Sequence, residues 1–331
     1  MISAKTSKML RGIAILIVIA SHYAGWMYVE PVHVTAHDWI LKWGPEGVSI
    51  FLLMSGYGLH KSAERGRHTK HNNSGITIGF VIKRVIGAYI PYLICRYLIN
   101  AFDGTWKSAA ADGEMKEVLI RFFTAGGFWY MNVLFTMYIA FMVIYRFFGK
   151  LRIPLITLAV IAQTYYLYDK GYADFWCLSN MAFVIGILAA TAEDKFRSFM
   201  QGPVFKVLLA AVSGAGMWYT FRGIQLNGGS RTETSFGWEL AFNIFFSLAV
   251  LFVGYMIPVY KGLILTTLGE CSLFIYILHT AMFWVLIYKF EEYGYAVSNI
   301  ITGFITLAVG TVIGVLYNNL MGIITKRLKN A

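Results

Sequence analysis

Two ionisable residues share one face of the first apolar segment. Arg11 and His22 stand eleven residues apart. That spacing is about three turns of a helix, so their side chains point the same way, roughly 16 Å apart along the axis. Charged and titratable groups are costly in lipid, so this face is expected to line a bundle interior or a wet cavity. A neutral imidazole, with an ordinary pKa of about 6.5, suits proton removal from a hydroxyl group at neutral pH.

Each of these residues also has a structural interpretation. Arg11 lies near the start of the apolar run and could be a flanking charge that snorkels to the lipid headgroups, as Lys5 and Lys8 are expected to do. His22 lies about 20 Å into a hydrocarbon layer of roughly 30 Å, too deep for snorkelling. A core histidine bonded to a neighbouring helix stays open, but we favour a functional histidine because membrane helices rarely carry one without a role.

A second polar face is expected nearer the C-terminus. Gly269, Ser272, Tyr276 and His279 follow one another at offsets of 0, 3, 7 and 10. On a helix these offsets fall within an arc of about 80°. Two segments therefore each present a histidine from a polar face, which favours a shared cavity over contact with lipid. The 3 cysteines have no paired spacing, so neither a disulfide nor a metal site is expected.

The elements that position these residues must be membrane helices. The chain has 331 residues, of which 58% are hydrophobic and 14% charged, a composition typical of polytopic α-helical membrane proteins and foreign to soluble domains. The first run is long and is followed by others, so it is expected to stay as an anchor. Ten apolar runs predict about ten membrane-spanning helices in a single all-α domain over residues 1–331: approximately 9–28, 46–60, 79–99, 128–147, 153–168, 175–191, 204–221, 237–257, 266–288 and 296–318.

The net charge of +11 follows the topology of these runs. With the N-terminus in the cytoplasm, lysines and arginines concentrate in the inner segments, which predicts that both termini are cytoplasmic. No nucleic-acid partner is expected, and the lipid bilayer of a plasma or inner membrane is the predicted location. Lys83 and Arg84 lie at the inner edge of the third run, where they are either topology charges or ligands for phosphate.

Several other features have plain structural interpretations. Trp129 and Tyr130 begin the fourth run, where aromatic residues commonly form an interfacial belt. Pro91 predicts a kink in the third run and a carbonyl group that needs a new partner. Gly186 and Gly310 belong to small-residue spacings that allow close helix contact.

Four motifs, in order, resemble those of the integral-membrane acyltransferase-3 family, whose members acylate sugars and cell-surface polysaccharides. Arg11 and His22, with ten residues between them, match the signature of its first helix. Residues 46–57 resemble its Gly-Val-x-x-Phe-Phe-x-x-Ser-Gly-Phe segment, and residues 129–138 its Trp-Phe/Tyr-Leu stretch. Residues 268–279 resemble its Leu-Gly-x-x-Ser-x-x-x-Tyr-x-x-His element. Within the family, the chain looks closer to the short stand-alone members.

The chain also departs from the family pattern. Gly87 stands where the third helix often has a second arginine. Gly127 and Leu134 stand where one branch has a histidine and a glutamate. The catalytic carboxylate roles of that branch therefore cannot be transferred to this chain.

The resemblance implies an O-acyltransferase that uses cytoplasmic acyl-CoA as co-substrate, with acetyl-CoA favoured, and has no bound cofactor. The acceptor would be a hydroxyl group of a sugar or cell-surface polysaccharide. His22 would be the general base or a transient acyl carrier, and Arg11 would hold the donor or offset developing thioester charge. Lys83 and Arg84 would bind the donor's phosphates. The cavity or substrate contacts would come from Ser55, Trp129, Tyr130, Ser272, Tyr276 and His279.

Another function class fits the same residues. A proton-coupled transporter or flippase of a polysaccharide precursor would use the histidines as a relay, but such proteins often show repeated halves, and no convincing internal repeat is present. A receptor or scaffold with structural polar faces would predict that no histidine replacement changes any activity. The acceptor glycan, the acyl group and the oligomeric state, including a homo-oligomer, stay open.

Overall fold

The structure is a computed structural model that describes residues 2–26, 43–70, 75–229, 232–256, 263–289 and 299–330. Helices fill these ranges, and no strand occurs within them. The predicted all-α class is therefore confirmed.

Eight helical stretches of the described chain are long and apolar enough to cross a membrane, which confirms a polytopic helical bundle. The first two predicted spans lie in α1 (Ala4–Trp26) and α3 (Gly44–Lys70), which carry charged residues and are not among the eight. The number of ten spans and the cytoplasmic placement of both termini stay predictions. The eight stretches are Ile78–Phe102, Trp129–Phe147, Gly149–Asp169, Asp174–Lys195, Pro203–Leu226, Phe236–Met256, Leu263–Ile287 and Ile301–Ile324.

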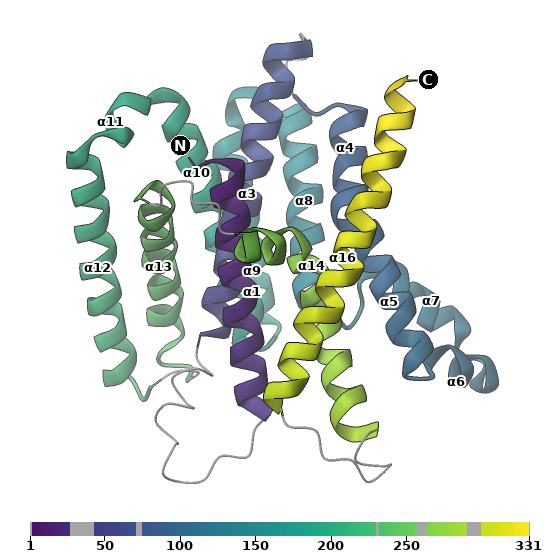
Figure 1. Ribbon diagram of the computed structural model, residues 1–331. Helices are drawn as coiled ribbons and strands as arrows, with labels where there is room; N and C mark the ends of the chain where they lie inside the picture. Colours follow the sequence, from purple (N-terminus) through teal and green to yellow (C-terminus); the bar gives the residue numbers. More distant parts are fainter. Residues whose placement is uncertain are drawn as a thin grey trace. The chain divides into compact units, whose positions relative to one another are not determined.

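The helices labelled in Figure 1 belong to two compact units. The first unit comprises Met1–Ser7, Pro45–Arg84 and Phe128–Lys261. It holds most of α3 together with α4 (Ile78–Arg84), α8 (Trp129–Phe147), α9 (Arg152–Asp169), α10 (Met181–Lys195), α11 (Arg197–Gln201), α12 (Pro203–Leu226) and α13 (Phe236–Met256).

The second unit comprises Lys8–Gly44, Val85–Gly127 and Gly262–Ala331. It holds most of α1 together with α5 (Ile90–Phe102), α6 (Thr105–Asp112), α7 (Met115–Thr124), α14 (Leu263–Trp284) and α16 (Asn299–Asn330).

Glycines let helices of the first unit touch through their backbones. A β-carbon on Gly56 of α3 would overlap the carbonyl oxygen of Phe183, and one on Gly186 of α10 would overlap that of Leu53. Close approach at small residues is the usual way in which membrane helices gain packing contacts. The predicted helix-contact role of Gly186 is therefore confirmed.

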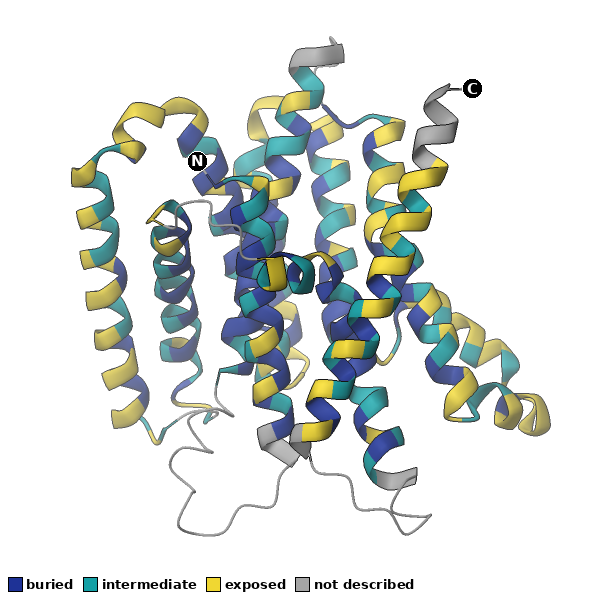
Figure 2. Cartoon of the chain, in the orientation of Figure 1, coloured by how far each residue is buried: buried dark blue, intermediate teal, exposed yellow. Residues whose placement is uncertain are grey.

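Glycines also allow helices of the second unit to approach closely. A β-carbon on Gly310 of α16 would crowd Ile275 of α14, and one on Gly314 would crowd Cys271. Figure 2 shows exposed residues along α12 and α16, and Val207 of α12 is one of the exposed apolar residues. Phe304 of α16 exposes 69% of its surface. Exposed apolar side chains on a membrane-spanning helix are those expected to meet lipid.

Pro91 lies in the first turn of α5, directly after a π-helical turn at Val85–Tyr89. An irregular turn changes the backbone hydrogen-bond ladder. The hydroxyl of Tyr317 donates a hydrogen bond of 2.6 Å to the carbonyl oxygen of Ile86 within that turn. The helix of the third apolar run is thus irregular close to Pro91, where a kink was predicted. A side chain from α16 supplies the hydrogen bond to a carbonyl group there.

Candidate functional site

The two histidines of the predicted polar faces are neighbours in the second unit. His22 on α1 and His279 on α14 have ring centroids 4.6 Å apart, with the rings at 74° to each other. His279 is buried, with 3% of its surface exposed, whereas His22 is partly exposed. The fold therefore brings together two residues that lie far apart in the sequence.

Both rings direct Nδ1 to a backbone carbonyl oxygen of their own helix. His22 Nδ1 lies 2.9 Å from the carbonyl oxygen of Val18, and His279 Nδ1 bonds that of Tyr276. A carbonyl oxygen can only accept, so Nδ1 must carry the hydrogen in each ring. In the neutral state Nε2 is then the nitrogen with the lone pair, and Nε2 of His22 is the atom that can take a proton.

Tyr23, the neighbour of His22, ties three helices of this unit together. Its hydroxyl donates to the carbonyl oxygen of His279 at 3.3 Å and lies 2.7 Å from Thr306 Oγ1 on α16. Because the hydrogen of Tyr23 is directed to His279, the Thr306 hydroxyl donates to Tyr23. The ring of Tyr23 also meets Phe283 edge-on at 5.6 Å. This contact anchors the segment that carries His22.

The helices α1 and α14 cross in direct backbone contact at positions nearer the N-terminus of each helix than the histidines. A β-carbon on Gly12 would overlap the carbonyl oxygen of Leu265, and one on Gly269 would overlap that of Lys8. Lys8 and Glu270 form an ion pair beside this crossing. Arg11 directly precedes Gly12 and is partly exposed, and roughly 16 Å of helix separates it from His22.

Tyr276 and Ser272 are the remaining predicted site residues of α14. Tyr276 is buried, and its ring lies 5.3 Å from that of His279. Ser272 is buried too, but its hydroxyl donates to the carbonyl oxygen of Gly269 at 3.0 Å. Tyr276 thus forms a wall of the histidine pair, whereas the hydrogen of Ser272 is used within its own helix.

The predicted donor-binding residues lie in the first unit at the end of α4. Lys83 is exposed. The guanidinium of Arg84 stands over the ring of Phe80 at 4.8 Å, and it interacts electrostatically with Tyr138. The hydroxyl of Tyr138 donates to Ser55 Oγ at 3.3 Å. Arg84 and Ser55, predicted from separate motifs, are therefore linked through one tyrosine.

Trp129 and Tyr130 have aromatic surroundings at the start of α8. Trp129 packs against Phe175 and Trp176, with ring centroids 5.1 and 6.1 Å away. Tyr130 is buried, and its ring lies 6.2 Å from that of Phe51. Tyr130 is therefore a packing residue of the first unit, whereas Trp129 lies among aromatic side chains at the start of α8.

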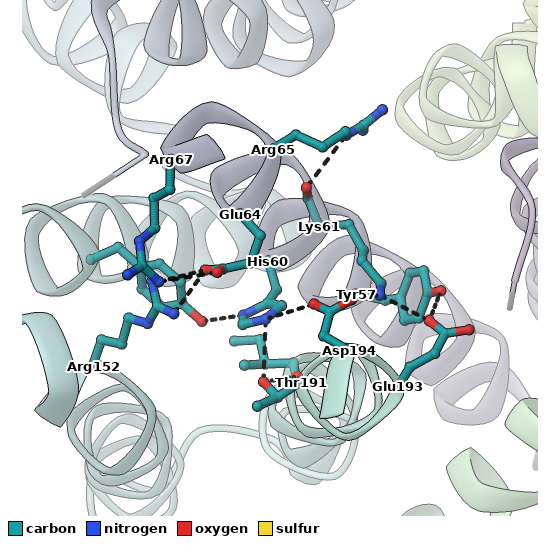
Figure 3. Close-up of polar contacts among 12 residues, drawn as sticks. Tyr57, His60, Lys61, Glu64, Arg65, Arg67, Arg152, Thr191, Glu193 and Asp194 are labelled. Atoms are coloured by element: carbon teal, nitrogen blue, oxygen red, sulfur yellow. Dashed lines mark hydrogen bonds and ion pairs between the residues drawn. The ribbon is translucent and has the colours of Figure 1, made fainter. Parts of the chain in front are cut away.

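A polar network at the end of α3 was missed by the sequence analysis (Figure 3). His60, with 2% of its surface exposed, places Nδ1 2.7 Å from the hydroxyl of Tyr145 and Nε2 3.3 Å from Thr191 Oγ1. Thr191 donates its own hydrogen to the carbonyl oxygen of Ile187. A neutral His60 therefore donates from Nε2 to Thr191 and accepts at Nδ1 from Tyr145.

Glu64 joins this network to α9. Its carboxylate accepts from Arg152 at 2.8 Å and from Arg67 at 3.0 Å, and Arg152 also stands over the Tyr145 ring at 5.0 Å. The two guanidinium groups hold the carboxylate, and only 18% of the Glu64 side chain is exposed.

Lys61 joins the network to α10. Its ammonium lies 2.5 Å from Asp194 and 3.1 Å from the buried Glu193, which also accepts a hydrogen bond from Tyr57 at 2.5 Å. Charges in the network are thus matched internally, and its role is to fasten α3 to α9 and α10. The signal was present in the sequence, because residues 57, 60, 61 and 64 recur at the spacing of one helix face.

Comparison with known proteins identifies the family. The acyltransferase-3 family model, described as an acyltransferase domain, matches residues 7–318. Neither the curated proteins nor the solved structures gave a match. Because the family match covers nearly the whole chain, including both histidines of the pair, the chain belongs to the acyltransferase-3 family. With its apolar helices it is a membrane acyltransferase.

Proposed function

We propose that this member of the acyltransferase-3 family transfers an acyl group, with acetyl favoured, from acyl-CoA to a hydroxyl group of a sugar or cell-surface polysaccharide. The observation that carries the proposal is the pairing of His22 and His279, with a backbone carbonyl oxygen at Nδ1 of each ring. That arrangement presents Nε2 of His22 as a base. Acyl transfer to a hydroxyl group needs a base at the hydroxyl proton.

His22 would act on the acceptor. As the acceptor oxygen bonds to the thioester carbonyl carbon, Nε2 of His22 takes the hydroxyl proton. The carbon–sulfur bond then breaks, and the coenzyme leaves as a thiol with the proton returned by the imidazolium. The carbonyl oxygen of Val18, 2.9 Å from Nδ1, favours that imidazolium because it accepts a stronger hydrogen bond from a charged donor. His279 and Tyr276 would restrict the ring's rotation.

Arg11 would bind a distant part of the donor. It lies roughly 16 Å from His22 along the same helix, which is beyond contact with a thioester that touches His22. This separation favours the holding of a donor phosphate over stabilisation of the thioester oxygen. A guanidinium suits that task because its paired N–H groups match phosphate oxygens.

Arg84 and Lys83 are the first unit's candidates for donor phosphates. The guanidinium of Arg84 is held over Phe80 and keeps its orientation, and Tyr138 and Ser55 supply hydroxyl groups beside it. Lys83 is exposed and would add charge without fixed geometry. The hydrogen bond from His22 Nδ1 to the carbonyl oxygen of Val18 fixes the tautomer that has its lone pair on Nε2, and this tautomer suits both a general base and a transient acyl carrier.

The test is transfer of radiolabelled acetyl from acetyl-CoA in proteoliposomes that contain equal amounts of folded protein. We expect His22→Ala to lower transfer to glycan or water by about 10²- to 10⁴-fold, the usual loss when a general base is removed. Arg11→Ala should weaken donor binding. The matched control is Arg222→Ala, which removes an exposed arginine outside the site and should leave transfer unchanged.

Two outcomes would contradict the proposal. Unchanged turnover in folded His22→Ala would remove the base from the mechanism. If wild-type protein neither bound nor consumed any of several short acyl-CoAs, the acyl-CoA donor would be wrong, and proton-coupled transport of a polysaccharide precursor would be tested next.

A further inference from the structure

The helix α7 in the second unit exposes a continuous apolar face. Leu119, Ile120 and Phe123 expose 41%, 53% and 53% of their surfaces. Met115, Val118 and Phe122 are partly covered. The helix therefore has one side packed in its unit and a second apolar side that its own unit leaves open.

The side chains of α7 fall into three arcs. At 100° per residue, the partly covered residues Met115, Val118 and Phe122 form the first arc. Leu119, Phe123 and Ile120 form the second arc, and Lys116 lies between Phe123 and Ile120. Glu117, Arg121 and Thr124, all exposed, lie opposite. An apolar arc beside a polar arc on a short helix is typical of an element that lies in the plane of a membrane surface.

α7 is fixed to a helix that belongs to a candidate membrane span. The hydroxyls of Tyr92 and Tyr89 donate to the carbonyl oxygens of Phe122 and Phe123 at 2.8 and 2.9 Å. Trp106 of α6 packs between Tyr97 and Phe122, with ring centroids 6.1 and 5.4 Å away. These contacts make α5, α6 and α7 one paddle, residues 90–124, which projects beside α16 in Figure 1.

The helix α5, to which α7 is bound, also carries exposed apolar residues. Tyr97 and Phe102 expose 57% and 68% of their surfaces, and both belong to the candidate span Ile78–Phe102. The turn between α5 and α6 is too short to move the paddle away from that span: Asp103 caps Thr105 at 2.9 Å, and Gly104 has a positive φ of 80°. The exposed apolar residues of α7 are therefore held beside the end of a candidate membrane span.

We propose that the paddle lies in the membrane interface, with Leu119, Ile120 and Phe123 covered by the acyl chains of lipids. Lys116 favours lipid over a second copy of the chain. In lipid its stem covers apolar surface while its ammonium reaches the phosphates, whereas a protein interface would bury its charge. The polar arc, with Glu117 and Arg121, faces water. This proposal stands apart from the acyl-transfer chemistry.

The test uses nitroxide labels on single cysteines in proteoliposomes. The three native cysteines are buried and are replaced first. Labels are placed at Leu119→Cys and Phe123→Cys on the apolar arc, and at Glu117→Cys and Thr124→Cys on the polar arc. Phe304→Cys on α16 gives the reference for a lipid-facing site. Each label is measured for collision with oxygen, which concentrates in lipid, and with a water-soluble nickel chelate.

We expect the oxygen-to-nickel ratio at positions 119 and 123 to match that at 304 and to exceed several-fold the ratio at 117 and 124. Equal nickel access at all four positions of α7 would place the helix in water and overturn the proposal. Low access of both reagents at 119 and 123 would show a protein cover and would also overturn it. Ile120→Cys repeats the measurement if either apolar-arc variant fails to fold.

Discussion

Tyr23 directly follows His22 in the sequence, and its hydroxyl donates a hydrogen bond to the backbone carbonyl oxygen of His279 at 3.3 Å. One side chain thus connects the helix of the first histidine to the backbone of the second. Thr306, 2.7 Å from the same hydroxyl, adds a third helix. The spacing of the histidine pair depends on this contact as well as on the rings themselves.

Removal of the Tyr23 hydroxyl should loosen the histidine pair. We expect Tyr23→Phe to lower kcat by about tenfold, the equivalent of about 1.4 kcal/mol and close to one hydrogen bond, with little change in the KM for donor. Initial rates of acetyl transfer measure both constants. Thr306→Val should have a similar effect and Thr306→Ser should not. Equal loss in both Thr306 variants would contradict a role for this hydroxyl.

An added methyl group at the α1–α14 crossing should separate the two helices. A β-carbon on Gly269 would overlap the carbonyl oxygen of Lys8, so Gly269→Ala should lower the unfolding free energy by about 1–3 kcal/mol. Thermal unfolding in detergent measures it through Tm. Gly214→Ala is the matched control, because a β-carbon there meets nothing within 4 Å. An equal Tm for both variants would contradict close backbone packing of α1 against α14 at Gly269.

The network around Glu64 should contribute to stability without affecting the chemistry. Glu64→Gln removes the charge that faces Arg67 and Arg152, and we expect a loss of about 1.5–3 kcal/mol, the range for hydrogen bonds to charged groups. Chemical unfolding in detergent measures the change. Glu117→Gln breaks a pair whose side chains are 66% and 68% exposed, and should stay within about 0.5 kcal/mol. A larger loss of unfolding free energy in Glu117→Gln than in Glu64→Gln would contradict the stabilising role of Glu64.

Arg84 should affect donor binding rather than turnover. We expect Arg84→Gln to raise the KM for acyl-CoA by about 10- to 150-fold at nearly constant kcat, since a lost charge-assisted bond costs about 1.5–3 kcal/mol in binding. Steady-state kinetics with varied acyl-CoA give both constants. Lys150→Gln, an exposed charge predicted on the same side of the membrane, is the control. A lower kcat at unchanged KM would assign Arg84 to another step.

Local patterns in the chain were sufficient to predict the helical membrane class and the polar faces. Hydropathy and helical periodicity depend on residues close in sequence, so the apolar runs and the face shared by Gly269, Ser272, Tyr276 and His279 could be recognised without a structure. The family motifs were local as well. The family match over residues 7–318 agrees with the resemblance they indicated.

Only the tertiary structure decided which faces meet. His22 and His279 are 257 residues apart, and no periodicity within either helix specifies the partner of the other. The same holds for Tyr23 with Thr306 and for Tyr57 with Glu193, which are 283 and 136 residues apart. Such pairs depend on how helices pack, which is set by the shapes of many side chains together and by glycines that allow backbones to touch.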